Sequence, residues 1–152
     1  MTVNYKSIAK KLKFEGRAFI NGKYVNAIDG KKFETINPAT GEKLCTVAKC
    51  NHKDVDLAVK ASRKSFDSGV WSRTSPEFRK DVLLKFAELL RQTGEENSVL
   101  ECVDTGKLIG DCINEVANDA PMHFQWYGEL IDKVFGKVGP TEPSLTSLIV
   151  KE

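Results

Sequence analysis

Cysteines and histidines are the first residues in this sequence that could do chemistry. They are Cys45, Cys50, His52, Cys102, Cys112 and His123. A structural zinc site needs four ligands around one tetrahedral centre, and a cysteine nucleophile needs a nearby base in an electropositive niche. We favour buried or half-buried thiols that pack as small hydrophobes. The alternatives are a zinc site and, at Cys102, a nucleophile.

Acidic residues form the second candidate group. Asp111, Glu115 and Asp119 are four residues apart, so on a helix they share one face. This face is either a solvated surface or a wall that attracts a cation. Asp104 stands at the expected end of a helix, just before Gly106, which we expect to be the left-handed C-cap. The helix dipole disfavours a carboxylate at this end. A carboxylate in this position is expected to be stabilised by a bound cation or by an interdomain hydrogen bond.

The first fifty residues contain the signals of short strands. Asn21-Gly22 lies between two apolar runs and predicts a hairpin with a type I′ turn. Strands are expected at Phe33–Ile36 and Leu44–Ala48. The preceding segment Asn4–Lys13 has the spacing of a basic amphipathic helix, which either docks on its own domain, as we favour, or lies on a membrane.

The remaining sequence has mostly helical periodicity. Asn51 is a plausible N-cap for a helix that reaches Phe66. Ser75-Pro76-Glu77 begins a second helix, which Gly94 ends. The apolar side chains of this second helix are expected to face a core; they are Phe78, Val82, Phe86, Leu89 and Leu90. A third helix is expected at Glu95–Val103. A long fourth helix follows from Leu108 to about Val134, with Pro121 as a kink or break. Gly136 and Gly139 interrupt the pattern before a final strand, Leu145–Val150.

The composition is that of one soluble domain. Of the 152 residues, 41% are hydrophobic and 29% are charged, as in ordinary globular proteins. The near balance of 23 basic and 21 acidic residues argues against a nucleic-acid partner. No apolar run approaches the ~20 residues of a membrane span, and Met1–Gly16 lacks the apolar core of a secretory signal. We therefore expect a cytoplasmic protein with free thiols.

Seven segments follow one another in the sequence: Phe19–Tyr24, Phe33–Glu42, Asp54–Phe66, Trp71-Ser72, Arg79–Leu90, Leu100–Lys107 and Trp126–Gly136. In this order they resemble the aldehyde dehydrogenase superfamily, and the resemblance covers almost the whole chain from Glu15 onward. Glu15–Gly22 and Ser68–Ser72 look most similar to bacterial enzymes that oxidise aminoaldehydes, of the gamma-glutamyl-gamma-aminobutyraldehyde or guanidinobutyraldehyde type.

The resemblance implies an α/β fold class. We expect the N-terminal portion of the aldehyde dehydrogenase fold, with a β-hairpin and short strands, then about four helices, then an oligomerisation-type strand. The Rossmann-like sheet core belongs to later sequence. Residues 1–134 would form the N-terminal part of the NAD(P)-binding domain, and residues 135–152 would begin the oligomerisation sheet.

The resemblance also implies an activity that this chain cannot complete. Family members oxidise aldehydes to carboxylic acids with NAD or NADP, using a Cys nucleophile, a Glu base and a Pro-Trp-Asn-Phe-Pro nucleotide motif. None of these stands at a matching position, so we expect a truncated enzyme with no catalytic or cofactor-binding residue and no cofactor of its own. Leu108 also stands where the family usually has Pro. The alternatives are a non-catalytic partner and a small self-standing binding module.

Two groups of site residues carry over from the family. A monovalent cation is bound through backbone carbonyls at positions that match Thr35, Ile36 and Asp104. The helix after Asp104-Thr105-Gly106-Lys107 lines the substrate tunnel, where Glu115 and Asp119 would hold the ammonium of an aminoaldehyde. An aldehyde substrate is expected only for the full-length relative, together with homo-oligomers or self-association.

Overall fold

A computed structural model describes residues 3–150, so the outermost positions of both expected domains lie outside the described residues. The described chain contains short strands, then helices, then a final pair of short strands. In order, the elements are α1 Tyr5–Ala9, β1 Ala18–Ile20, β2 Lys23–Val25, β3 Lys32–Ile36, β4 Lys43–Ala48, α2 His52–Ser68, α3 Pro76–Gln92, α4 Gly94–Thr105, α5 Ile109–Cys112, the π-helix η1 Ile113–Asp119, α6 Ala120–Leu130, β5 Lys137–Gly139 and β6 Ser147–Ile149.

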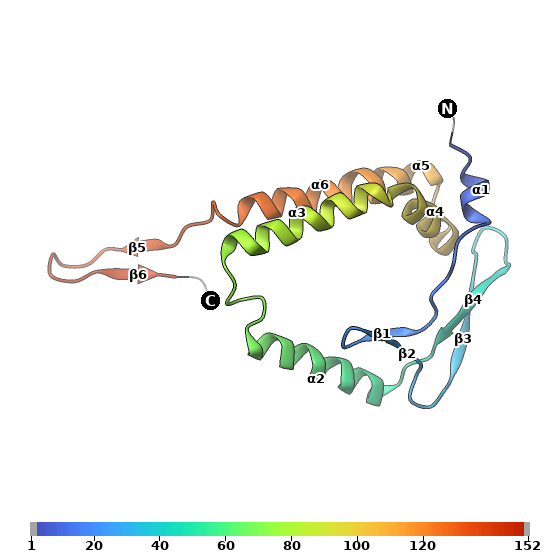
Figure 1. Cartoon of the computed structure of the whole chain (residues 1–152), viewed down its shortest axis with the longest axis horizontal. Helices are drawn as coiled ribbons and strands as arrows, with labels where there is room; N and C mark the ends of the chain where they lie inside the picture. The colour runs from blue at the N-terminus through green and yellow to red at the C-terminus, as the bar shows by residue number, and fades with distance from the viewer. Residues whose placement is uncertain (1–2, 151–152) are drawn as a thin grey trace.

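The strands form three separate antiparallel hairpins, β1-β2, β3-β4 and β5-β6. In the first turn Asn21 and Gly22 have φ of 51° and 75°, which confirms the expected type I′ geometry. The last hairpin projects away from the helices (Figure 1). Its first strand corrects the sequence prediction, because we expected Gly136 and Gly139 to interrupt the pattern. The pairing of Lys137 with Ile149 places this segment in a ladder instead.

Helix α2 begins where the sequence predicts. The Asn51 side chain accepts from the Lys53 amide at 2.9 Å, and Asp54 Oδ2 accepts from the Asn51 amide at 2.9 Å. The other oxygen, Asp54 Oδ1, accepts from the Ile28 amide at 2.9 Å. One buried carboxylate therefore caps the helix and ties it to the loop after β2.

Gly94 does not end a helix, contrary to the sequence prediction. Helix α3 stops at Gln92, and Gly94 is the first residue of α4. A Cβ at this glycine would lie 2.9 Å from the Ala117 Cβ. The glycine therefore serves a close approach between two helical segments rather than a left-handed cap.

The expected long fourth helix is three segments, and it ends at Leu130 rather than near Val134. Its middle, Ile113–Asp119, is a seven-residue π-helix in which the Ala120 amide donates to the Glu115 carbonyl. Pro121 is the second residue after it and is fully buried. A break at Pro121 was expected, but its form was not.

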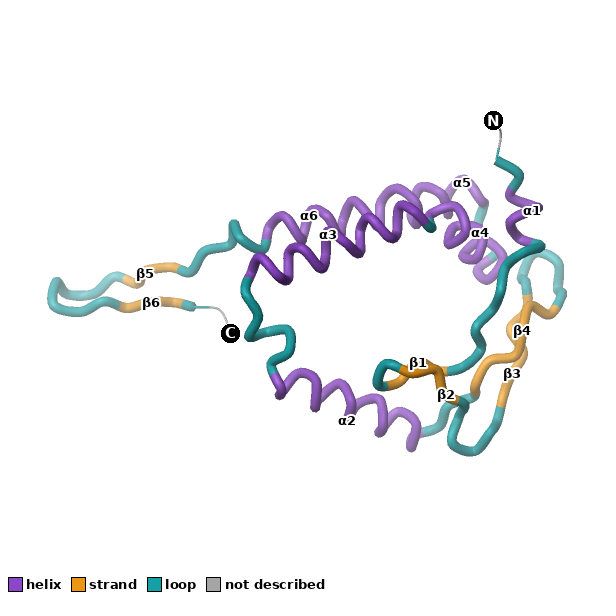
Figure 2. Tube along the Cα trace, in the orientation of Figure 1, coloured by secondary structure: helices purple, strands orange, loops and turns teal. Residues whose placement is uncertain are grey.

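Helices α3 and α6 run side by side, whereas α2 is separate from them (Figure 2). Ala87 on α3 is fully buried. The apolar side chains of α3 that we expected to face a core are mostly exposed; Phe78 is 50% and Leu89 is 46% exposed. Helix α1 is shorter than expected and contacts α4, which favours docking. Within residues 3–150, the structure has no helix that is both long enough and apolar enough to span a membrane.

Candidate functional site

The end of β3 meets the end of α4 at the residues expected to hold a cation. The Thr35 hydroxyl donates to Asp104 Oδ1 at 3.3 Å, although the two residues are far apart in sequence. Thr35 is half-buried and Asp104 is exposed. The carboxylate that the helix dipole disfavours thus has a hydroxyl partner from another element.

The backbone beside Thr35 is irregular. The β3-β4 ladder pairs Thr35 with Cys45 and then Ile36 with Lys43, so Leu44 is an extra residue on β4. A bulge of this kind bends the strand and interrupts the ladder. The loop after β3 also contacts the end of α4, because a Cβ on Gly106 would lie 3.1 Å from Pro38 Cγ. Gly106 has φ of 75°, which is the left-handed C-cap predicted from the sequence.

Lys107 follows this cap and links α4 to the π-helix. Its Nζ lies 2.5 Å from Glu115 Oε2 and 3.7 Å from Glu101 Oε1. The hydrogen bond to Glu115 raises the pKa of Lys107 above its ordinary value, and burial opposes that effect. Sequence spacing did not reveal this pair, because its geometry depends on the turn that Gly106 makes.

The two expected substrate acids have different surroundings. The carboxylate of Glu115 is engaged by Lys107, whereas Asp119 makes no side-chain hydrogen bond or ion pair to any described residue. The Asp119 carbonyl lies 2.7 Å from His123 Nδ1. Of these two carboxylates, Asp119 is therefore the one that remains open to a cationic ligand.

The thiols do not gather into a metal site. Within residues 3–150 there is no group of three or more potential metal-binding Cys, His, Asp or Glu side chains. Cys112 is fully buried and Cys45 and Cys102 are half-buried, but Cys50 is exposed, which corrects the expectation of buried thiols for that residue. Burial is the main cause that raises the pKa of Cys112, so this thiol is a poor nucleophile.

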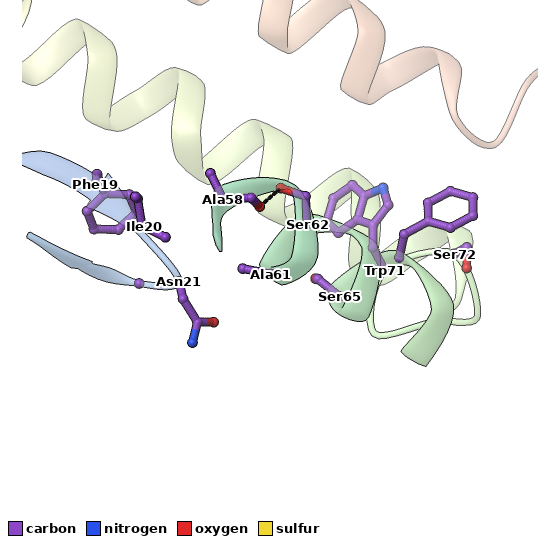
Figure 3. A pocket seen from close by; sticks show the side chains of 11 residues that line it. Phe19, Ile20, Asn21, Ala58, Ala61, Ser62, Ser65, Trp71 and Ser72 are labelled. Carbon is purple, nitrogen blue, oxygen red and sulfur yellow. Dashed lines mark hydrogen bonds between the residues drawn. The ribbon is translucent and has the colours of Figure 1, made fainter. Parts of the chain in front are cut away.

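A hollow between the β1-β2 turn and α2 is the feature that sequence reasoning missed (Figure 3). Phe19, Ala58 and Trp71 contribute to its mostly apolar wall, and the Ser62 hydroxyl turns back to the Ala58 carbonyl at 2.9 Å. None of its lining side chains titrates. The hollow therefore offers no acid–base chemistry.

Residues 24–152 match the aldehyde dehydrogenase family. The chain belongs to the aldehyde dehydrogenase family. It is 40% identical over 144 residues to the NADP/NAD-dependent aldehyde dehydrogenase PuuC of Escherichia coli K12, covering 95% of this chain and 29% of that protein. It is 38% identical over 148 residues to the aminoacetaldehyde dehydrogenase of Pseudomonas aeruginosa, covering 97% and 30%.

A solved aldehyde dehydrogenase structure agrees with these matches. The gamma-glutamyl-gamma-aminobutyraldehyde dehydrogenase of Burkholderia cenocepacia J2315 superposes with a TM-score of 0.90 and 42% identity, covering 95% of this chain and 29% of that one. These findings confirm the resemblance, the aminoaldehyde-type relatives and the expected N-terminal portion of the aldehyde dehydrogenase fold. This chain spans less than a third of the length of those relatives.

The E. coli relative is an NADP/NAD-dependent enzyme, as its name states. Dinucleotide folds commonly place a glycine-rich loop before a helix N-terminus to hold the pyrophosphate. No G-x-G-x-x-G loop occurs in the sequence.

Proposed function

We propose that this chain forms part of an NAD(P)-dependent enzyme that oxidises aminoaldehydes to carboxylic acids, and that it has no such activity alone. The observation that carries the proposal is the match over residues 24–152, with relatives named for aminoaldehyde substrates. The proposed inactivity follows from the resemblance, in which none of the four cysteines matches the family's nucleophile; they are Cys45, Cys50, Cys102 and Cys112.

The open carboxylate of Asp119 supports an aminoaldehyde substrate. A carboxylate about 4 Å from an ammonium gains ~1 kcal/mol in bulk water and ~4 kcal/mol at an effective dielectric of 20. Glu115 can bind the substrate ammonium only if its carboxylate gives up the ion pair with Lys107. We therefore assign the main ammonium contact to Asp119.

Thr35, Ile36 and Asp104 are proposed to hold a monovalent cation through their backbone carbonyls, which are oxygen ligands suited to hard cations. The contact between the Thr35 hydroxyl and the Asp104 carboxylate supports this assignment, since it brings the two segments together. The cation would fix the end of β3 against the end of α4.

Residues 1–134 and 135–152 are proposed as two parts of the enzyme, the start of the cofactor domain and the start of an oligomerisation sheet. The projecting β5-β6 hairpin supports this division (Figure 1). Its Val138 and Leu148 are 72% and 66% exposed. Apolar strand residues in that state favour association with another copy.

The test joins residues 1–152 to the remainder of an aminoaldehyde-oxidising relative. Kinetics are measured with an aminoaldehyde and a neutral aldehyde of equal length. Asp119→Asn should lower kcat/KM about 10-fold or more for the aminoaldehyde and leave the neutral substrate unchanged. The matched Glu115→Gln variant should have a smaller effect.

The unjoined chain is the control for the first half of the proposal, and it should not reduce NAD or NADP with either substrate. Reduction above a heat-treated sample would refute the statement that the chain is inactive alone. An equal response of both substrates to Asp119→Asn would refute the ammonium contact.

A further inference from the structure

The π-helix between α5 and α6 calls for a physical cause, because π-helical turns are rare and occur frequently at functional sites. Within it, each amide reaches back five residues rather than four, so the turn is wider than an α-turn. The Ala120 amide donates to the Glu115 carbonyl in this way. The segment includes both acids of the proposed substrate region.

Pro121 provides the first part of the cause. Proline has no N–H, and inside an α-helix its ring clashes with the carbonyl four residues earlier. That residue here is Ala117, in the middle of the π-helix. A wider turn before Pro121 relieves the clash, and the proline ring is then fully buried in the helical unit.

Gly94 provides the second part from a different element. It is buried at the start of α4, and a Cβ placed on it would come 2.9 Å from the Ala117 Cβ and 3.1 Å from the Ala117 Cα. Only a residue without a side chain leaves room for the π-helix at this distance. Ala117 is therefore held between Gly94 on one element and Pro121 on the next turn.

The width of this turn sets where the two acids point. In an uninterrupted α-helix, residues four apart would lie above one another, and Glu115 would share a face with Asp119. In the wider turn each hydrogen bond spans one more residue, so Asp119 is rotated about the helix axis relative to the position that it would take in an α-helix. The carboxylate of Glu115 instead meets Lys107 Nζ, and Asp119 stays without a described side-chain partner.

We propose that Gly94 and Pro121 are positioning residues that hold the π-helical turn, so that Glu115 pairs with Lys107 and Asp119 is left open. This inference rests on the proposed function for the meaning of the open acid. The π-helical turn and the pair Lys107–Glu115 are formed entirely by residues of this chain. Their geometry can therefore be tested without measuring any enzyme activity.

The test is an NMR titration of the Lys107 side chain in the full 152-residue protein. Glu115 at 2.5 Å and Glu101 at 3.7 Å are the acids that contact its ammonium, and Glu115→Gln gives the reference loss of the shift. Pro121→Ala restores a backbone donor and favours a continuous α-helix. We expect it to lower the pKa of Lys107 toward the Glu115→Gln value and to remove the hydrogen bond from the Ala120 amide to the Glu115 carbonyl.

Two matched substitutions serve as controls. The first is Gly110→Ala, because a Cβ placed on Gly110 has, beyond its own helix backbone and chain neighbours, no atom of the described residues within 4 Å. The second is Pro76→Ala, because Pro76 lies at the start of α3, where proline is tolerated. Neither should change the pKa of Lys107. Gly94→Ala should act like Pro121→Ala where it folds, and where it does not fold Pro121→Ala decides alone.

The proposal is overturned if folded Pro121→Ala keeps the parent pKa of Lys107 and the parent hydrogen bond of the Ala120 amide. Failure of the proposed function gives a different result. In that case the joined enzyme shows no substrate discrimination by Asp119, while the NMR shift still follows Pro121. The two results are therefore separable.

Discussion

Helices α2 and α3 have the same length, 17 residues, and both begin with a side-chain cap. They differ in what covers them. Helix α3 packs along α6 and buries Ala87 completely, whereas α2 contacts mainly the β1 strand and leaves Val59 60% and Phe66 69% exposed. The difference shows that a cap decides where a helix begins, while its stability depends on the face that is buried.

The largest expected effect on stability comes from removing the buried Asp54 carboxylate, which holds the start of α2 to the loop after β2. Asp54→Ala removes the acceptor of the Ile28 and Asn51 amides, and hydrogen bonds to charged groups contribute about 1.5–3 kcal/mol each. We expect the free energy of unfolding to fall by about 3 kcal/mol, measured by urea denaturation followed by circular dichroism. The exposed Asp56→Ala on the same helix should change it by less than about 0.5 kcal/mol. Equal losses of unfolding free energy in Asp54→Ala and Asp56→Ala would show that the two hydrogen bonds of Asp54 are not the cause.

A smaller effect is expected from overfilling the α3–α6 contact. Ala87→Leu adds volume to a fully buried position, which costs about 1–3 kcal/mol. The same change in α2, Ala61→Leu, borders the hollow in Figure 3 and has room. Its cost in the same denaturation experiment should stay below about 0.5 kcal/mol. Similar costs at both positions would contradict the contrast between the helices.

The smallest effect concerns an ion pair between α3 and the end of α6. Hydrogen bonds from Lys133 and then Lys80 lower the pKa of Asp132 from 3.8 to about 2. A carboxyl with a lowered pKa contributes stability above its unfolded pKa and loses it as the pH falls through its folded pKa. The difference in thermal midpoint between the parent and Asp132→Asn should therefore shrink as the pH drops from about 4 to about 2.

The matched pair on α2 is Arg63–Asp67, at 3.4 Å and fully at the surface. Surface ion pairs of this kind contribute little, so Asp67→Asn should leave the thermal midpoint nearly unchanged. A pH-independent difference for Asp132→Asn would indicate that Asp132 acts through packing rather than through charge.

The turns and helix caps that depend on neighbouring residues were predictable from the sequence. Asn21-Gly22, the cap at Ser75 and the left-handed Gly106 each depend on a few neighbouring residues, and all three stand as expected. Gly94 was misread because its role depends on Ala117, which belongs to another element. The π-helix was missed for the same reason, since Pro121 indicates a break but not how neighbouring turns absorb it.

The candidate site was predictable only in part. The resemblance named Thr35 and Asp104, and their contact joins a strand to a helix that no spacing rule connects. The pair Lys107–Glu115 was not foreseen. A lysine just after a helix C-cap glycine, followed by an acid in the next helix, is the signal that could have indicated it.

Amide hydrogen exchange on the 152-residue chain tests the contrast between α2 and α3 most directly. Amides in buried, packed helices exchange through large openings, and those in uncovered helices through local fraying. We predict slow exchange around Ala87 on α3 and Gly128 on α6, and much faster exchange around Ala58 and Ser62 on α2. Equal protection of the two helices, or greater protection of α2, would contradict the account.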